Sequence, residues 1–162
     1  MGSDLQTKTL ELARRFLYFN EPTTQEYKDN LYKLFCDTWD NIPAEDQKII
    51  ENSLGFIITK PIIDQLNPST VGFTHLCPPR MSWIIWDPFF LGLHMESLRF
   101  LLAHELAHVF LQHPQKGSEM SREDENKWAL DTAEPEAVYQ TLKVWHFMPS
   151  LDDKEMFKSS DY

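Results

Sequence analysis

Three residues in the middle of the chain have the types and the spacing to hold a metal ion. His104, Glu105 and His108 form the pattern His-Glu-x-x-His. On an α-helix, residues four apart lie on one face, so His104 and His108 can direct two imidazoles at one point. Glu105 lies about 100° further round, where it can reach a water bound to the metal but not the metal itself. The pattern therefore predicts a Zn²⁺ site with Glu105 as its general base.

The residues around this pattern predict that the helix carrying it is buried. Residues 98–113 are apolar at most positions and on nearly every side of the expected helix. Buried histidines and a buried glutamate need polar partners, because an unpartnered polar group in an apolar interior is costly. A divalent cation satisfies all three side chains at once, and hydrogen bonds within the core are the alternative.

The length and patterning of the chain predict one α+β domain over residues 1–149, followed by a polar tail over 150–162. The 162 residues are enough to bury a substantial core. Residues 1–54 form the expected helical segment, with helices at 4–19, 24–39 and 43–53. Residues 55–149 form the expected sheet and active-site helices, with strands at 55–60, 70–77 and 80–87. The sheet is expected to be small and mostly antiparallel.

Composition excludes two classes of partner. The formal net charge of −10 argues against nucleic acid and against an anionic membrane surface, since both require clustered basic residues. No apolar run reaches the roughly 18 residues that a membrane-spanning helix needs. The N-terminus lacks the basic and apolar regions of a signal peptide, so a cytoplasmic location is expected. The sequence leaves the oligomeric state open.

The stretch around the motif resembles a known group of enzymes. Residues 102–110 read Leu-Ala-His-Glu-Leu-Ala-His-Val-Phe and are similar to the extended motif of zincin-type metallopeptidases. The resemblance is closest at this helix, extends more loosely over residues 80–149, and is nearest to minimal gluzincins and ImmA/IrrE-like proteases. It implies a zincin-like fold, a catalytic Zn²⁺ and a peptide or protein substrate. It also implies that the strand at 80–87 is an edge along which substrate adds. Trp83 and Trp86 would suit side-chain pockets there, and a place in the core, the more common one for a tryptophan in a strand, is the alternative.

A catalytic zinc needs a third protein ligand and keeps one position open. In gluzincins this ligand is a Glu on a following helix, and Glu136 with Ala137 resembles the Glu-Ala pair of that family. Gln140 stands where the family has a group that hydrogen-bonds a ligating histidine. The alternatives for the third ligand are Glu134 and the acids at 123–125. His113 lies about 140° from the ligand face of a continued helix, so a structural or loop role is expected for it.

With His104, His108 and Glu136 as ligands, the resemblance implies hydrolysis of peptide bonds by a water that Glu105 deprotonates. Tyr139 and His146 are candidates for stabilising the oxyanion, although Tyr139 is rather expected in the core. The alternative interpretation is a zincin-fold regulatory or interaction protein with a structural or latent metal site. A tail acid, such as Asp152 or Asp153, would then be a fourth ligand. The intact Glu105 favours an enzyme, because a structural site needs no general base.

Overall fold

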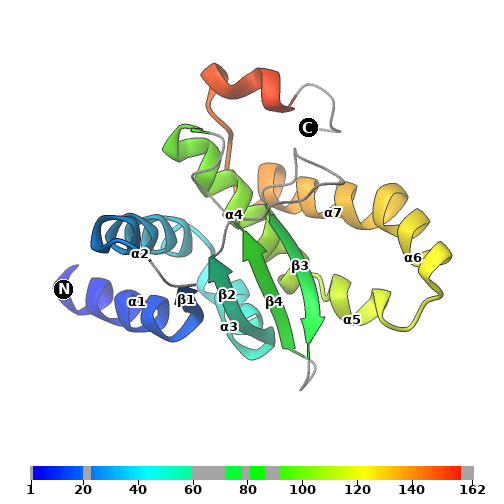
Figure 1. Cartoon of the computed structure of the whole chain (residues 1–162), viewed down its shortest axis with the longest axis horizontal. Coiled ribbons are helices and arrows are strands. Elements are labelled where there is room, and N and C mark those ends of the chain that lie inside the picture. Colours follow the sequence, from blue (N-terminus) through cyan, green and yellow to red (C-terminus); the bar gives the residue numbers. More distant parts are fainter. Residues whose placement is uncertain (1, 20–22, 60–71, 78–80, 87–91, 158–162) are drawn as a thin grey trace.

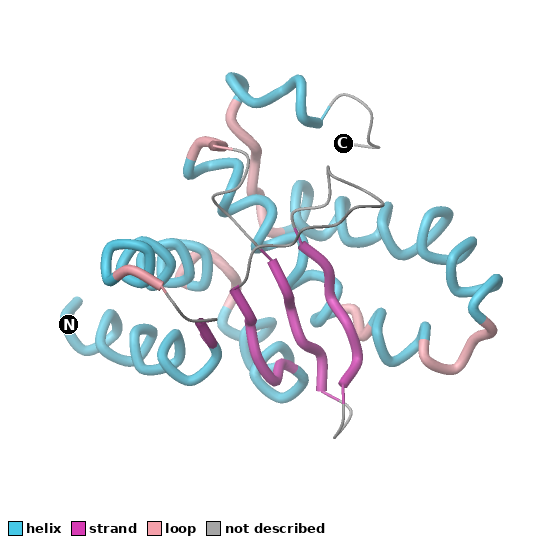
Figure 2. Tube along the Cα trace, in the orientation of Figure 1, coloured by secondary structure: helices cyan, strands magenta, loops and turns pink. Residues whose placement is uncertain are grey.

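The computed structural model describes residues 2–19, 23–59, 72–77, 81–86 and 92–157, which form a mostly helical α+β fold around one small sheet (Figures 1 and 2). The strands are β1 (Leu17–Phe19), β2 (Leu54–Thr59), β3 (Gly72–Cys77) and β4 (Met81–Trp86). The α-helices are α1 (Gly2–Phe16), α2 (Gln25–Trp39), α3 (Ala44–Ser53), α4 (Met95–Phe110), α5 (His113–Gly117), α6 (Arg122–Trp128) and α7 (Glu134–Tyr139). A 3₁₀-helix over Leu151–Phe157 follows them.

The N-terminal helices begin where the sequence predicts. Thr24 is the N-cap of α2, and its hydroxyl accepts a hydrogen bond from the Tyr27 backbone N–H at 3.2 Å. Helix α3 follows Pro43, whose fixed φ suits the start of a helix. The first helix ends at Phe16, earlier than the expected residue 19, because the chain from Leu17 joins the sheet as β1.

The expectation of a mostly antiparallel sheet is wrong. The strand order is β1-β2-β4-β3, with β1 parallel to β2 and β2 parallel to β4. Among the described strands, only β3 and β4 pair in antiparallel fashion, from Gly72 opposite Trp86 to Cys77 opposite Met81. The cause lies in the connection between β1 and β2, which runs through α2 and α3, since a helical crossover returns the chain in the same direction.

The strand order also shows that the strand expected to be the substrate edge, at residues 80–87, is not at an edge of the sheet. Strand β4, which directly precedes the motif helix, pairs with β2 on one side and β3 on the other. It is therefore an inner strand, and β3 is at one end of the sheet as far as the described residues form it. Trp83 of β4 is half-buried and packs edge-on against Phe56, with ring centroids 5.4 Å apart. The side chain of Trp86 lies outside the described part of the structure.

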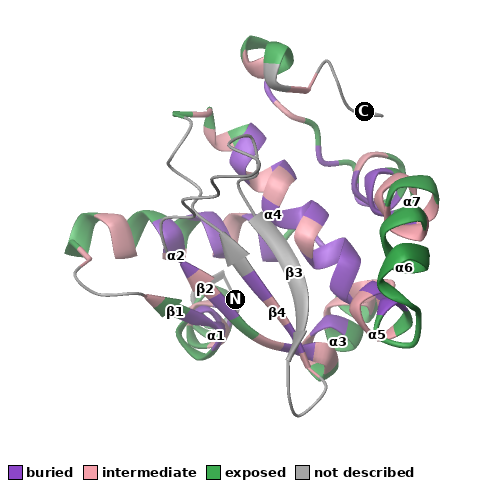
Figure 3. Ribbon diagram, turned by 45° about the vertical axis from the view of Figure 1, so that its right-hand side comes forward, coloured by how far each residue is buried: buried purple, intermediate pink, exposed green. Residues whose placement is uncertain are grey.

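Helix α4 is the buried centre of the fold (Figure 3). It packs against α2, α3, α7 and β3. On the side of α1 and α2, Phe16, Phe35 and Trp39 form an aromatic cluster, in which the Phe35 and Trp39 rings stack at 5.4 Å. These contacts fix the backbone that carries the two histidines. Within the described residues, no helix combines the length and apolarity needed to cross a bilayer.

The contact between β2 and β4 gives a test of this packing. A Cβ at Gly55 would lie 2.6 Å from Nε1 of Trp83 and 3.3 Å from Cβ of Met81. We therefore expect Gly55→Ala to lower the free energy of unfolding by about 1–3 kcal/mol, measured by urea denaturation. In a Trp83→Leu background the same change should cost less, because the indole that it displaces is gone. An equal cost in both backgrounds would contradict the assigned clash.

Candidate metal centre

Two histidines of α4 and one glutamate of α7 converge on a single point. Nε2 of His104 lies 3.2 Å from Nε2 of His108 and 3.0 Å from Oε2 of Glu134. Nε2 of His108 lies 3.2 Å from Oε1 of the same carboxylate. Among the described residues, these three form a group whose ligand atoms all lie within 4.8 Å of one another.

The donors of this group suit a divalent metal. Ligands at about 2.0–2.1 Å from a tetrahedral ion are about 3.3 Å apart, close to the separations found here. The imidazoles are buried, with side chains 5% and 10% exposed, whereas Glu134 is 45% exposed and faces the solvent side. Two imidazole nitrogens and a carboxylate oxygen could therefore hold a metal ion between two buried side chains and one half-exposed side chain.

Glu134 reaches the histidines because the helix that carries it is locally widened. The sequence predicts a new helix capped by Thr132, but the chain from Arg122 to Val144 is helical throughout, with π-helical turns at Ala129–Ala133 and Gln140–Val144. In the first turn, the Glu134 N–H bonds to the Ala129 carbonyl, five residues back. Pro135 accounts for the widening, because its ring lacks an N–H and would clash with the carbonyl four residues earlier in a regular α-helix.

Glu136, the expected third ligand, is not part of the group. Its Oε2 lies 2.9 Å from Nε2 of His113 instead. The prediction of Glu136 rested on the likeness of Glu136-Ala137 to the Glu-Ala pair of gluzincins, whereas the π-helical turn before Glu134 affects which acid faces α4. The structure thus brings together His104, His108 and Glu134. Glu134 is one of the alternatives to Glu136 that the sequence left open for the third ligand. The acids at 123–125 lie on α6, which has no buried residue.

His113 is the site residue that the sequence reasoning missed. Its Nδ1 lies 2.8 Å from Nδ1 of His108, inside the protein. The angular argument against His113 assumed a continuous helix, but α4 ends at Phe110 and Gln112 adopts a left-handed conformation with φ 60°. This turn brings His113 back onto His108. The signal in the sequence was Pro114, which starts the next helix and so implies a break before His113.

The charges of the group affect each other's protonation. Burial by itself would raise the pKa of Glu134. Hydrogen bonds with His104 and His108 have the larger opposite effect, so the pKa lies below its ordinary value and the carboxyl stays ionised. Burial lowers the pKa of His108, but the hydrogen bond to Glu134 and the charge of Glu105 outweigh this and raise it. For His113 burial prevails and lowers the pKa. A metal competes with protons for such nitrogens, so its affinity increases with pH.

Glu105 occupies the place that the motif assigns to a general base. It follows His104 on α4 and is half-buried. The negative charge of Glu105 contributes to the raised pKa of His108. Gln140 is buried in the second π-helical turn, but the atom that lies against Nδ1 of His108 is Nδ1 of His113.

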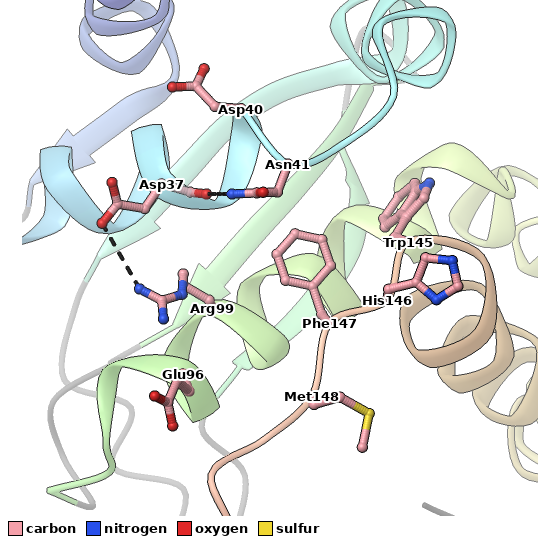
Figure 4. A pocket seen from close by; sticks show the side chains of 9 residues that line it. All are labelled: Asp37, Asp40, Asn41, Glu96, Arg99, Trp145, His146, Phe147 and Met148. Carbon is pink, nitrogen blue, oxygen red and sulfur yellow. Dashed lines mark hydrogen bonds and ion pairs between the residues drawn. The ribbon is translucent and has the colours of Figure 1, made fainter.

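The two oxyanion candidates lie on the surface. Tyr139 is 64% exposed, so the expectation of a core position is wrong. His146 has φ 61° and lines a pocket of about 600 Å³ with residues of α2 and α4 (Figure 4). In that pocket Arg99 lies 3.9 Å from the Asp37 carboxylate. None of the three metal-group residues lines it, so the structure does not join His146 to the metal group.

The tail acids bind elsewhere. Asp153 accepts hydrogen bonds from the His94 backbone N–H at 3.0 Å and from the Ser97 hydroxyl at 2.5 Å, at the start of α4. Its second oxygen lies 2.9 Å from Nδ1 of His94. Further along, Phe157 packs edge-on against Phe100. These contacts dock the tail on α4 and leave Asp153 outside the metal group.

Comparison with known proteins gave no match: no protein-family model, no curated protein and no solved structure corresponds to the chain. The resemblance to zincin metallopeptidases therefore stays a prediction from the motif at residues 102–110.

Metal titration separates the two rival acids. We expect wild type to bind one Co²⁺ or Zn²⁺ per chain, and His104→Ala and Glu134→Ala to lose more affinity than the 10–100-fold typical of an outer-shell change. Glu136→Ala should still bind one metal at saturation, because its carboxylate lies on His113. The absorption of bound Co²⁺ measures the affinity, and elemental analysis measures the number of metal ions per chain. Loss of metal from Glu136→Ala with retention in Glu134→Ala would reverse the assignment.

The docked tail predicts a pH effect. The hydrogen bond to Asp153 raises the pKa of His94, so this contact stabilises docking below about pH 6.5 and is lost as the pH rises through the raised value. Asp153 is desolvated, but hydrogen bonds from Ser97 and His94 lower its pKa, so its contribution is present above about pH 3.9 and is lost as the pH falls through the lowered value. Docking of the tail on α4 should therefore be tightest between about pH 3.9 and about pH 6.5.

An NMR titration of the His94 imidazole tests this contact. Asp153→Asn should return its pKa toward 6.5, since the amide keeps the shape of the carboxylate without its charge. Asp152→Asn is the matched control, because Asp152 lies 3.8 Å from the same ring and is 78% exposed. An equal effect of both changes would mean that only general charge acts on His94.

Proposed function

We propose that the protein is a small zinc-dependent metallopeptidase. The observation that carries the proposal is the group of His104, His108 and Glu134, with Glu105 next to it on the same helix. The imidazoles and the carboxylate would be the zinc ligands. The bound Zn²⁺ would supply Lewis acidity and lower the pKa of water to about 7.

The chain's own base in this reaction is Glu105. Its carboxylate accepts a proton from the water that attacks the peptide carbonyl and returns this proton to the amine that leaves when the C–N bond breaks. The half-buried position of Glu105 and its charge beside His108 support this role. The exposed side of Glu134 leaves room for a substrate to approach the group.

Substrate binding is proposed at the end of the sheet. Strand β3 is the last strand in the order, and it packs against α4. An extended peptide can add to such a strand through backbone hydrogen bonds, which tolerate many side chains. The substrate edge is thus proposed at β3 rather than at the strand directly before the motif helix.

The alternative is a regulatory protein with a structural metal site. Structural zinc sites normally have four protein ligands, whereas the described part of the chain offers three in this group. Asp153, the acid that would close the site, is held by His94 and Ser97. Both observations favour the enzyme.

Substitution of the general base tests the proposal. Glu105→Gln should reduce cleavage of a fluorescence-quenched peptide library by about 10²–10⁴-fold and leave one zinc per chain, because the amide cannot take a proton. Glu96→Gln, an exposed change on the same helix, is the control and should retain activity. A wild type that binds zinc but cleaves no peptide in the library would support the regulatory alternative.

A further inference from the structure

A continuous chain of contacts leads from the protein surface to the metal group. Oε2 of Glu136 lies 2.9 Å from Nε2 of His113, and Nδ1 of His113 lies 2.8 Å from Nδ1 of His108. Nε2 of His108 then faces His104 and Glu134. The side chains of His113 and His108 are only 3% and 10% exposed, so water cannot readily replace these contacts. Both ring nitrogens of His113 therefore have one defined neighbour each, as does Nδ1 of His108.

The short Nδ1–Nδ1 contact allows two arrangements of protons. A neutral imidazole carries one proton, so one of its nitrogens donates and the other accepts. In the first arrangement, His108 donates from Nδ1 to His113, and the lone pair of His108 lies on Nε2, toward the metal group. In the second, His113 donates to His108, and Nε2 of His108 carries the proton and cannot bind a metal.

Glu136 distinguishes between these arrangements. In the first, Nε2 of His113 carries a proton and donates it to the carboxylate. In the second, a nitrogen lone pair would face a carboxylate oxygen at 2.9 Å, and two acceptors repel each other. Only the first arrangement gives both short contacts of His113 a donor and an acceptor, and it leaves the lone pair on Nε2 of His108 for a metal ion.

We propose that Glu136, acting through His113, selects the tautomer of His108 that binds the metal. Both are positioning residues, since neither belongs to the metal group itself. The ring of Trp128 packs edge-on against His113 at 5.4 Å and helps to hold its plane. This inference rests on the proposed function, because it requires a zinc ion at the group.

The test is the zinc dissociation constant, measured by competition with a chromophoric chelator at neutral pH. We expect Glu136→Gln to weaken binding about 10-fold, since an amide can donate to His113 as readily as accept from it. Glu136 is 49% exposed, so the variant should fold. Glu123→Gln removes the same charge from the exposed helix α6 and should bind zinc like wild type.

A second variant separates tautomer selection from simple electrostatics. In His113→Asp, a carboxylate oxygen bonded to Cγ replaces Nδ1 and can only accept, so affinity should remain near that of wild type. Glu136→Gln should then have no further effect. Two results would overturn the role of Glu136 while the zinc site itself remained supported. In the first, Glu136→Gln weakens zinc binding in the His113→Asp background as much as it does in wild type. In the second, wild type and Glu136→Gln bind zinc with equal affinity. A wild type that binds no zinc would overturn both proposals.

Discussion

The structure depends on one constraint, the burial of two imidazoles in an almost entirely apolar helix. His104 and His108 lie among Leu, Ala, Phe and Val side chains of α4, where a polar atom without a partner is costly. The surrounding elements supply these partners. Glu134 comes from the next long helical stretch, and His113 comes from the turn after α4. The arrangement of the C-terminal half follows from this need.

Apolar packing around α4 and hydrogen bonds at its two ends both hold this helix in place. Aromatic packing of α1 and α2 and the contacts with the sheet fix the backbone of α4. Side-chain hydrogen bonds hold both ends of this helix, with Asp153 at its start and Gln112, which donates to the Ser53 hydroxyl at 2.8 Å, just after its end. A functional group needs such rigid support, because small displacements of ligands weaken a metal site.

Local signals in the sequence predicted the elements better than their arrangement. The cap at Thr24 and the His-Glu-x-x-His pattern depend on neighbouring residues, and they identified two helices and two members of the metal group. The parallel pairing of β2 with β4 depends on contacts far apart in the chain, which a periodicity cannot encode. The choice of Glu134 over Glu136 required the π-helical turn, and the position of His113 required a left-handed Gln112, a conformation that usually marks glycine.

The widened turn before Glu134 also constrains how the chain can diverge. A π-helical turn holds one residue more than an α-helical turn, so deletion of one residue from Ala129–Ala133 with return to a regular α-helix would leave later residues in nearly their present direction relative to α6. Closure of the turn to an α-helix without a deletion would instead rotate the later residues by roughly 90°, and the carboxylate would leave the histidines. An insertion before Ser121, where the helix begins, would leave this phase unchanged. The extra residue and the widened turn therefore depend on each other, and neither can be lost alone without moving Glu134 away from the histidines.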